Sequence, residues 1–108
     1  MPLTLCVLLW SVDGQEGRLS TYEDEVLALI PEYGGAVASR VRRVGGDHQH
    51  PYEVQVIELP DQNAMDGYLA DPRRTALASL RDEVVSRTEI ISVTPVVPDL
   101  LGRSTLGQ

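Results

Sequence analysis

Ile30-Pro-Glu-Tyr-Gly-Gly35 marks the first corner between a helix and a strand in this chain. An amphipathic segment precedes this corner and an apolar segment follows it. Gly34-Gly35 is suited to end a helix, because glycine adopts the left-handed backbone conformation without steric cost. Two further breaks, Gly45-Gly46 and Asp71-Pro72, divide the rest of the chain. The resulting order is strand, helix, strand, strand, helix, strand.

Hydrophobic periodicity gives the extent of these elements. We expect a helix from Asp61, as its N-cap, to the break at Asp71-Pro72. We expect further helices over residues 16–33 and 73–86, and strands over residues 3–12, 36–44, 52–59 and 89–96. This order predicts an α+β, ferredoxin-like βαββαβ fold, in which four antiparallel strands carry helices on one face. The domain should cover residues 1–97, followed by a C-terminal tail, residues 98–108, without apolar periodicity.

The segment 3–12 is apolar on both faces of the predicted strand, and such strands are usually covered on both faces. The domain's own helices can cover one face, but 108 residues provide no second layer for the other. We therefore expect a homodimer in which two sheets pack face to face. The two alternating sets are Leu3, Leu5, Val7 and Leu9, and Cys6, Leu8, Trp10 and Val12.

Charge and composition exclude several classes of protein. The chain has 16 acidic and 9 basic side chains and a net charge of −7. We expect no nucleic-acid partner, because neutralising phosphates requires clustered positive charge. No apolar run approaches the length of a membrane span, so we expect no membrane partner and a cytoplasmic location. The single cysteine, Cys6, cannot form an internal disulfide.

Four motifs together resemble the dimeric α/β-barrel superfamily, and within it the chain looks most like the small domain family of unknown function DUF1330. These motifs are Tyr22-Glu23, Pro31-Glu-Tyr-Gly-Gly35, Val56-Ile-Glu-Leu-Pro60 and Tyr68-Leu-Ala-Asp-Pro-Arg73. The resemblance covers about residues 3–95. It implies a dimeric, ferredoxin-like fold. Members of the superfamily include cofactor-independent monooxygenases of polyketide pathways, cyclases, isomerases, haem-binding enzymes and proteins with no known activity, so the resemblance implies no single reaction.

Two departures from the family pattern concern candidate residues. The third strand ends Glu58-Leu59, where relatives often have Glu-Phe, and the loop 47–50 matches no family motif. That loop holds the only two histidines, His48 and His50. Neutral imidazole titrates near pH 7, so His50 is a candidate general base. A metal site usually needs three or four protein ligands, so a solvated loop is the alternative to metal binding by these histidines.

Arg40 and Arg42 are candidate ligand-binding residues on the second strand. If residues 45–51 connect a hairpin, Glu58 should lie near Arg40. Two guanidinium groups beside one carboxylate can hold an anionic substrate group. A structural salt-bridge ladder on the sheet or at the dimer interface is the interpretation we favour, because ion pairs between strands are common.

Three aromatic residues complete the candidate site. Tyr22 and Tyr68 belong to the apolar stripes of their predicted helices, where a hydroxyl could orient a phenol or an enolate; they are candidate catalytic residues. A core tyrosine whose hydroxyl reaches the surface is the alternative. Trp10, at the end of the first strand, is a candidate ligand-binding residue at the barrel mouth or a dimer contact.

Several motifs are absent from the sequence. It contains no Gly-rich phosphate loop, nucleophile elbow, Cys-X-X-Cys pair or zinc-protease motif, so we expect no cofactor and no metal. Three hypotheses remain open. The chain is a cofactor-independent monooxygenase, cyclase or isomerase acting on a small organic, polyketide-like substrate; or it is a non-catalytic dimer that binds a ligand or a partner; or it binds haem or a metal through His48 and His50.

Overall fold

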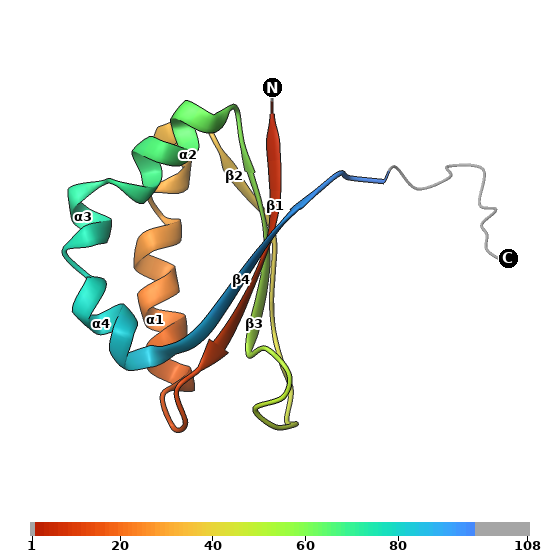
Figure 1. Ribbon diagram of the computed structural model, residues 1–108, viewed down its shortest axis with the longest axis vertical. Helices are drawn as coiled ribbons and strands as arrows, with labels where there is room; N and C mark the ends of the chain where they lie inside the picture. The colour runs from red at the N-terminus through yellow and green to blue at the C-terminus, as the bar shows by residue number, and fades with distance from the viewer. Residues whose placement is uncertain (1, 97–108) are drawn as a thin grey trace, which may run out of the picture.

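The computed structural model describes residues 2–96 and confirms the predicted α+β, ferredoxin-like fold (Figure 1). Its four strands form one antiparallel sheet with the order β2-β3-β1-β4. The strands are β1 (Leu3–Ser11), β2 (Ala36–Arg42), β3 (Glu53–Leu59) and β4 (Val85–Val93). The helices are α1 (Glu16–Leu27), the 3₁₀ helix η1 (Ile30–Tyr33), α2 (Gln62–Leu69), α3 (Pro72–Thr75) and α4 (Ala78–Val84). The predicted tail, residues 98–108, lies outside the described residues.

The corner between η1 and β2 depends on two glycines with different roles. Gly34 caps η1 with a positive φ of 79°, a left-handed conformation in which glycine carries no steric penalty. Gly35 allows a close approach to β3, since a Cβ atom there would lie 2.3 Å from the backbone oxygen of Glu58. Glycine is therefore needed at both positions.

Three predicted boundaries were wrong. The helix expected over 16–33 ends at Leu27, and a separate 3₁₀ turn contains Pro31, which has no backbone N–H for a helical hydrogen bond. The stretch 73–86 forms two short helices, α3 and α4. Strand β4 begins at Val85, directly after α4, and not at residue 89. The predicted N-cap was correct, since the Asp61 side chain accepts a hydrogen bond of 2.8 Å from the Ala64 backbone N–H.

All helices lie on one side of the sheet (Figure 1). The core between the two layers includes Leu5 and Leu9 from β1 and Leu19 and Val26 from α1. By strand alternation, Leu8 and its neighbours on β1 point to the opposite face. No helix or strand within residues 2–96 covers that opposite face, which we call the open face.

A bulge in β2 determines which of its side chains face the helices. Val37 pairs with Ile57, but Ser39 pairs with Val56, so Ala38 is an extra residue. After this bulge Arg40 pairs with Gln55. The bulge therefore turns Arg40 towards the helices, on the same side of the sheet as the buried Ile57.

No helix within residues 2–96 is both long enough and apolar enough to span a membrane.

Candidate functional site

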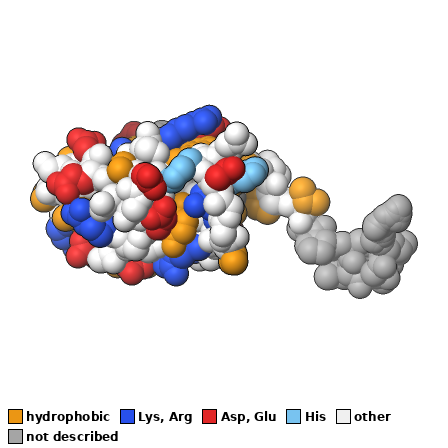
Figure 2. All heavy atoms as spheres, turned by 90° about the horizontal axis from the view of Figure 1, so that it is seen from below, with side chains coloured by type: hydrophobic (Ala, Val, Ile, Leu, Met, Phe, Trp, Pro, Cys, Tyr) orange, Lys and Arg blue, Asp and Glu red, His pale blue; other side chains and the backbone are white. Residues whose placement is uncertain are grey.

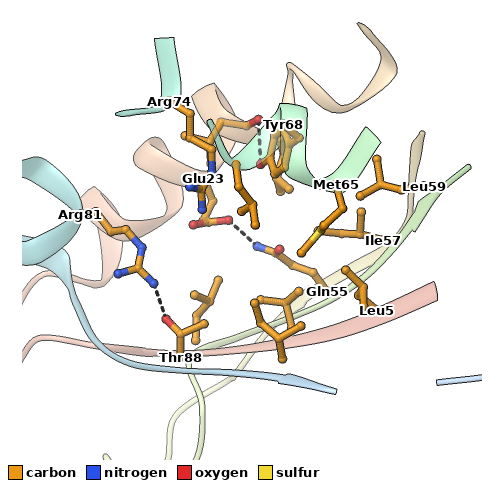
Figure 3. A pocket seen from close by; sticks show the side chains of 16 residues that line it. Leu5, Glu23, Gln55, Ile57, Leu59, Met65, Tyr68, Arg74, Arg81 and Thr88 are labelled. Atoms are coloured by element: carbon orange, nitrogen blue, oxygen red, sulfur yellow. Dashed lines mark hydrogen bonds between the residues drawn. The ribbon is translucent and has the colours of Figure 1, made fainter. Parts of the chain in front are cut away.

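A cavity of about 60 Å³ lies between the sheet and the helices (Figure 3). Its wall comes from β1, β3 and β4 on one side and from all the α-helices on the other. Ile90 of β4 lines it although that side chain is 51% exposed, so the cavity opens at the β4 edge of the sheet. Most lining side chains are apolar; the polar ones are Glu23, Gln55, Tyr68, Arg74, Arg81 and Thr88.

Glu23 is a buried carboxyl group in the wall of this cavity. Helix α1 places it one turn after Leu19 and one turn before Val26, on the face that packs against the sheet. Only 6% of the residue is exposed. Its Oε1 accepts a hydrogen bond of 2.8 Å from Gln55 Nε2. Burial raises the pKa of Glu23 above its usual value, although the Gln55 hydrogen bond opposes that shift.

Gln55 connects Glu23 to a second buried carboxylate, Glu53. Its Nε2 also donates to Glu53 Oε1 at 2.9 Å, so one amide holds both side chains. Glu53 accepts further hydrogen bonds from Arg40 Nε at 2.6 Å and from Ser20 Oγ at 2.9 Å. Burial by itself would raise the pKa of Glu53, but these hydrogen bonds outweigh burial and the pKa is lowered. The pKa values of these two neighbouring glutamates are thus shifted in opposite directions, and Glu23 is the one whose protonated form is favoured by its surroundings.

Two arginines reach the same cavity from the helices. Arg74 of α3 lies with its guanidinium carbon 5.2 Å from the centroid of the Tyr68 ring. Its Nε atom is buried and has no hydrogen-bond partner among the described residues. Arg81 of α4 donates from Nη2 to Thr88 Oγ1 of β4 at 2.8 Å. Figure 3 shows Arg74 and Arg81 at the same end of the cavity as Glu23.

Of the two predicted catalytic tyrosines, Tyr68 lines the cavity and Tyr22 does not. The Tyr68 hydroxyl donates to the Val26 backbone oxygen at 3.1 Å. Burial raises the pKa of Tyr68 to about 12. Tyr22 is 1% exposed and belongs to the core; burial raises its pKa, and the charge of Arg74 opposes that shift. A catalytic role for either tyrosine stays a prediction, and the geometry favours Tyr68.

His50, His48 and Trp10 lie away from the cavity. Both histidines are exposed in the loop between β2 and β3, at the end of the molecule that Figure 2 shows. His48 Nε2 is 3.4 Å from Asp13 Oδ1. Within residues 2–96, no three His, Cys, Asp or Glu side chains are grouped closely enough to hold a metal ion. Trp10 is on the open face, where the Arg87 guanidinium stacks 4.4 Å from its ring centroid.

The predicted contact between Arg40 and Glu58 was wrong. Glu58 pairs with Ala36 near the other end of the hairpin and is exposed. Arg40 binds Glu53, and Arg42 Nε lies 3.4 Å from the same carboxylate. The bulge at Ala38 and the true register of the hairpin explain the difference. Ligand binding by these residues remains untested, but their contacts fit a structural ion pair.

Apart from Tyr68, sequence reasoning missed the polar residues that line the cavity. Helical spacing contains a signal for Glu23, since it lies four residues after Leu19 and three before Val26. No comparable signal identifies Gln55, because Val54 and Val56 make the opposite face of β3 the more apolar one. Arg74 and Arg81 come together only because α3 and α4 fold back over β4.

This arrangement is suited to proton transfer on a small organic molecule. A carboxyl group with a raised pKa can accept a proton and return it. Guanidinium groups nearby can stabilise a negative charge that develops on a substrate oxygen. The apolar remainder of the cavity excludes water and strengthens both effects.

No family model and no curated protein matches the chain. Solved structures are similar to it in fold. A protein of unknown function from Rhodopseudomonas palustris has a TM-score of 0.69 at 17% identity, over 90% of this chain and 84% of that one. An uncharacterised NIPSNAP domain protein from Burkholderia xenovorans has a TM-score of 0.65 at 19% identity, over 92% of this chain and 100% of that one.

A third similar structure is described as a dimeric protein of unknown function with a ferredoxin-like fold, from Bacteroides fragilis. Its TM-score is 0.64 at 11% identity, over 85% of this chain and 94% of that one. At these identities the similarities show the ferredoxin-like fold but do not identify a reaction.

Proposed function

We propose that this protein is a small homodimeric enzyme of the dimeric α/β-barrel type, acting without a cofactor on a small organic, polyketide-like substrate. One observation carries this function: the buried carboxyl group of Glu23, with its raised pKa, lines an apolar cavity beside Arg74. Perturbed carboxyl groups of this kind cluster at catalytic sites.

The reaction begins with a proton transfer. The ionised Glu23 carboxylate removes a proton from a carbon next to a carbonyl group; the C–H electron pair forms a C=C bond and the π pair of the carbonyl moves to its oxygen to give an enolate. Arg74 and Arg81 lie at the polar end of the cavity, and each guanidinium has five N–H donors, so they can stabilise that oxygen with donors left for a second acceptor. Gln55 holds the carboxylate in position through its hydrogen bond of 2.8 Å.

The fate of the enolate separates the possible reaction types. Return of the proton to a different carbon gives an isomerase, and attack of the enolate carbon on a second carbonyl gives a cyclase. With dioxygen as co-substrate, a CH₂ group becomes C=O and the second oxygen atom leaves as water, which is the monooxygenase type. All three require the base and the oxyanion donors first, so Glu23 is the residue to test.

The open face supports a homodimer. Val41, Ile91 and Val93 lie on it with exposed fractions of 55%, 47% and 37%, and Leu8 and Val56 lie between them. A contiguous apolar surface of this kind is typical of an interface. One similar structure is described as dimeric. We propose that two copies pack through this face, with one cavity on the far side of each sheet.

Deuterium exchange at an activated carbon tests the enzyme directly. The probe is 2-tetralone, a compact apolar ketone, incubated with protein in D₂O and followed by proton NMR. We expect the protein to accelerate loss of the CH₂ signal, and Glu23→Gln to reduce that acceleration by roughly 10²–10⁴-fold. Glu25→Gln is the matched control, since Glu25 is exposed on the same helix.

Two results contradict the enzyme. One is exchange no faster than in buffer, and the other is equal acceleration by the wild type and by Glu23→Gln. Binding of 2-tetralone without exchange, seen as shifts in the protein's amide NMR signals, favours the non-catalytic ligand-binding dimer instead.

A further inference from the structure

The cavity contains two arginines that form no salt bridge within residues 2–96. The net charge of the chain is −7, so acidic side chains that could pair with an arginine outnumber the basic ones. Five other arginines in the described part of the chain form salt bridges: Arg18, Arg40, Arg42, Arg73 and Arg87. Within residues 2–96, neither Arg74 nor Arg81 forms one. Both line the cavity.

Arg74 is held in place and lacks an acceptor. Its guanidinium group lies over the Tyr68 ring, with 5.2 Å between the guanidinium carbon and the ring centroid. The Nε atom is buried and has no hydrogen-bond partner among the described residues. A buried donor without a partner is unfavourable, because it has lost its water and gained nothing in return. An acceptor oxygen from a bound molecule removes that penalty.

Arg81 lies at the mouth of the same cavity. Its hydrogen bond of 2.8 Å goes to the Thr88 hydroxyl, which is a neutral acceptor. Guanidinium carries five N–H donors in a planar fork, which matches the geometry of a carboxylate. The contact with Thr88 therefore orients Arg81 without neutralising its charge.

The charges in the cavity do not balance. Among the lining residues, Glu23 is the only acid, and it faces two guanidinium groups. The cavity therefore carries a net positive charge whether Glu23 is ionised or protonated. An organic anion restores neutrality, whereas a neutral ligand leaves an excess charge in partly apolar surroundings.

The opposite end of the cavity is apolar. Figure 3 shows Leu5, Ile57, Leu59 and Met65 at that end, away from Arg81 and Glu23. A ligand complementary to both ends has an apolar body and an anionic head, and a body larger than the cavity of about 60 Å³ requires the helices to move away from the sheet when it binds.

We propose that the cavity binds small carboxylic acids with an apolar body, and that Arg74 and Arg81 hold the carboxylate. This substrate class rests on the proposed function, since it refers to the same cavity. It adds a selectivity that the proton transfer does not require: the substrate enters as a carboxylate, and its matched amide is rejected. Arg74 and Arg81 are then the residues that determine specificity.

Isothermal titration calorimetry with trans-cinnamate and trans-cinnamamide tests this selectivity, because the two molecules share the same body and differ only in the head group, a carboxylate in one and a neutral amide in the other. We expect cinnamate to bind at least roughly tenfold more tightly than cinnamamide, which is the effect of one charge-assisted hydrogen bond. Arg74→Gln and Arg81→Gln should each reduce that ratio towards one. Arg74→Lys keeps the charge and should retain part of the preference.

Arg43→Gln is the matched control, because Arg43 is a half-buried arginine that stacks on Tyr52 outside the cavity. It should leave the ratio unchanged. Melting temperatures of all variants show whether a loss of binding reflects unfolding, and Arg74→Gln and Arg81→Gln are two independent tests of the site. Equal binding of the acid and the amide overturns the proposed selectivity. So does an unchanged ratio in both glutamine variants of the cavity, or no binding of either probe at about 1 mM.

Glu23→Gln separates this selectivity from the catalytic function. Removing the negative charge of Glu23 should leave cinnamate binding as tight or make it tighter, while deuterium exchange is lost. If exchange fails in the wild type but the acid is still preferred, the enzyme is refuted and the anion site stands. If exchange succeeds and the acid and amide bind equally, the reverse holds.

Discussion

Replacing Glu53 with glutamine should strongly destabilise the protein. Glu53 is fully buried and accepts hydrogen bonds from Arg40, Ser20 and Gln55. A glutamine keeps the shape but loses the negative charge, so the Arg40 guanidinium is left beside a neutral amide. Removing one partner of a buried ion pair costs about 3–5 kcal/mol. Arg40 keeps its contacts with Asp24 and the Ser20 backbone oxygen, so we expect the lower end of that range.

Urea denaturation measures this loss. For a domain of this size the free energy of unfolding falls by about 1–3 kcal/mol per M of urea, so a loss of about 3 kcal/mol lowers the midpoint by roughly 1–3 M. All samples need the same protein concentration, because dimerisation adds to the apparent stability. The difference in unfolding free energy between the wild type and Glu53→Gln should also depend on pH. The pKa of Glu53 is lowered on folding, so its stabilisation is present above the ordinary value of 4.5 and is lost as the pH falls.

Asp24→Asn is the matched control. Asp24 binds the same guanidinium group, with 2.5 Å between Arg40 Nη1 and Asp24 Oδ1, but its side chain is 59% exposed. Exposed ion pairs contribute about 1 kcal/mol or less. If Glu53→Gln costs no more than Asp24→Asn, the buried ion pair is not structural, and Arg40 becomes a candidate for binding ligand.

Three further predictions concern the corner, the open face and the cavity. Gly35→Ala should lower the free energy of unfolding by about 1–3 kcal/mol, because its Cβ would lie 2.3 Å from the Glu58 backbone oxygen. Gly17→Ala is the control: its Cβ would have nothing within 4 Å, so it should stabilise α1 by up to about 1 kcal/mol. Equal effects of the two substitutions would contradict the close approach at Gly35. Leu8→Asp should convert the dimer to a monomer in sedimentation velocity while the far-UV circular dichroism spectrum is retained; a persisting dimer refutes packing through the open face. The pKa of Glu23 is raised on folding, so the wild type should lose stability as the pH rises through that pKa, whereas Glu23→Gln should not; parallel pH profiles in thermal denaturation contradict the buried position of Glu23.

The order of elements could be predicted from the sequence, because the signals that end each element are local. Gly34 caps a helix through its own backbone conformation, and Asp61 caps the next helix through its own side chain. Asp71-Pro72 ends α2 because proline restricts the residue before it. None of these effects depends on the rest of the fold.

The site could not be predicted in the same way, because tertiary contacts determine it. The bulge at Ala38 turns the Arg40 side chain to the opposite face of the sheet, and no residue type in β2 predicts a bulge at that position. Gln55 points towards the helices, whereas its more apolar neighbours Val54 and Val56 point to the open face. Hydrophobicity alone would predict the reverse. Glu23 lies within the apolar stripe of α1. Glutamate is rarely buried, so the sequence alone predicts that its side chain is exposed to solvent. Its burial is tolerated because Gln55 donates to it.

Carbon-13 NMR of the glutamate side-chain carboxyl groups tests the central claim most directly. Protein labelled at glutamate Cδ is titrated with and without cinnamate, and the Glu23 signal is assigned by its loss in Glu23→Gln. We predict that Glu23 titrates above the ordinary glutamate value of 4.5, because it is buried. We also predict that bound cinnamate raises this pKa further, because a second negative charge in the cavity disfavours ionisation. A Glu23 that titrates at its ordinary value and does not respond to cinnamate contradicts both the buried base and the anion site.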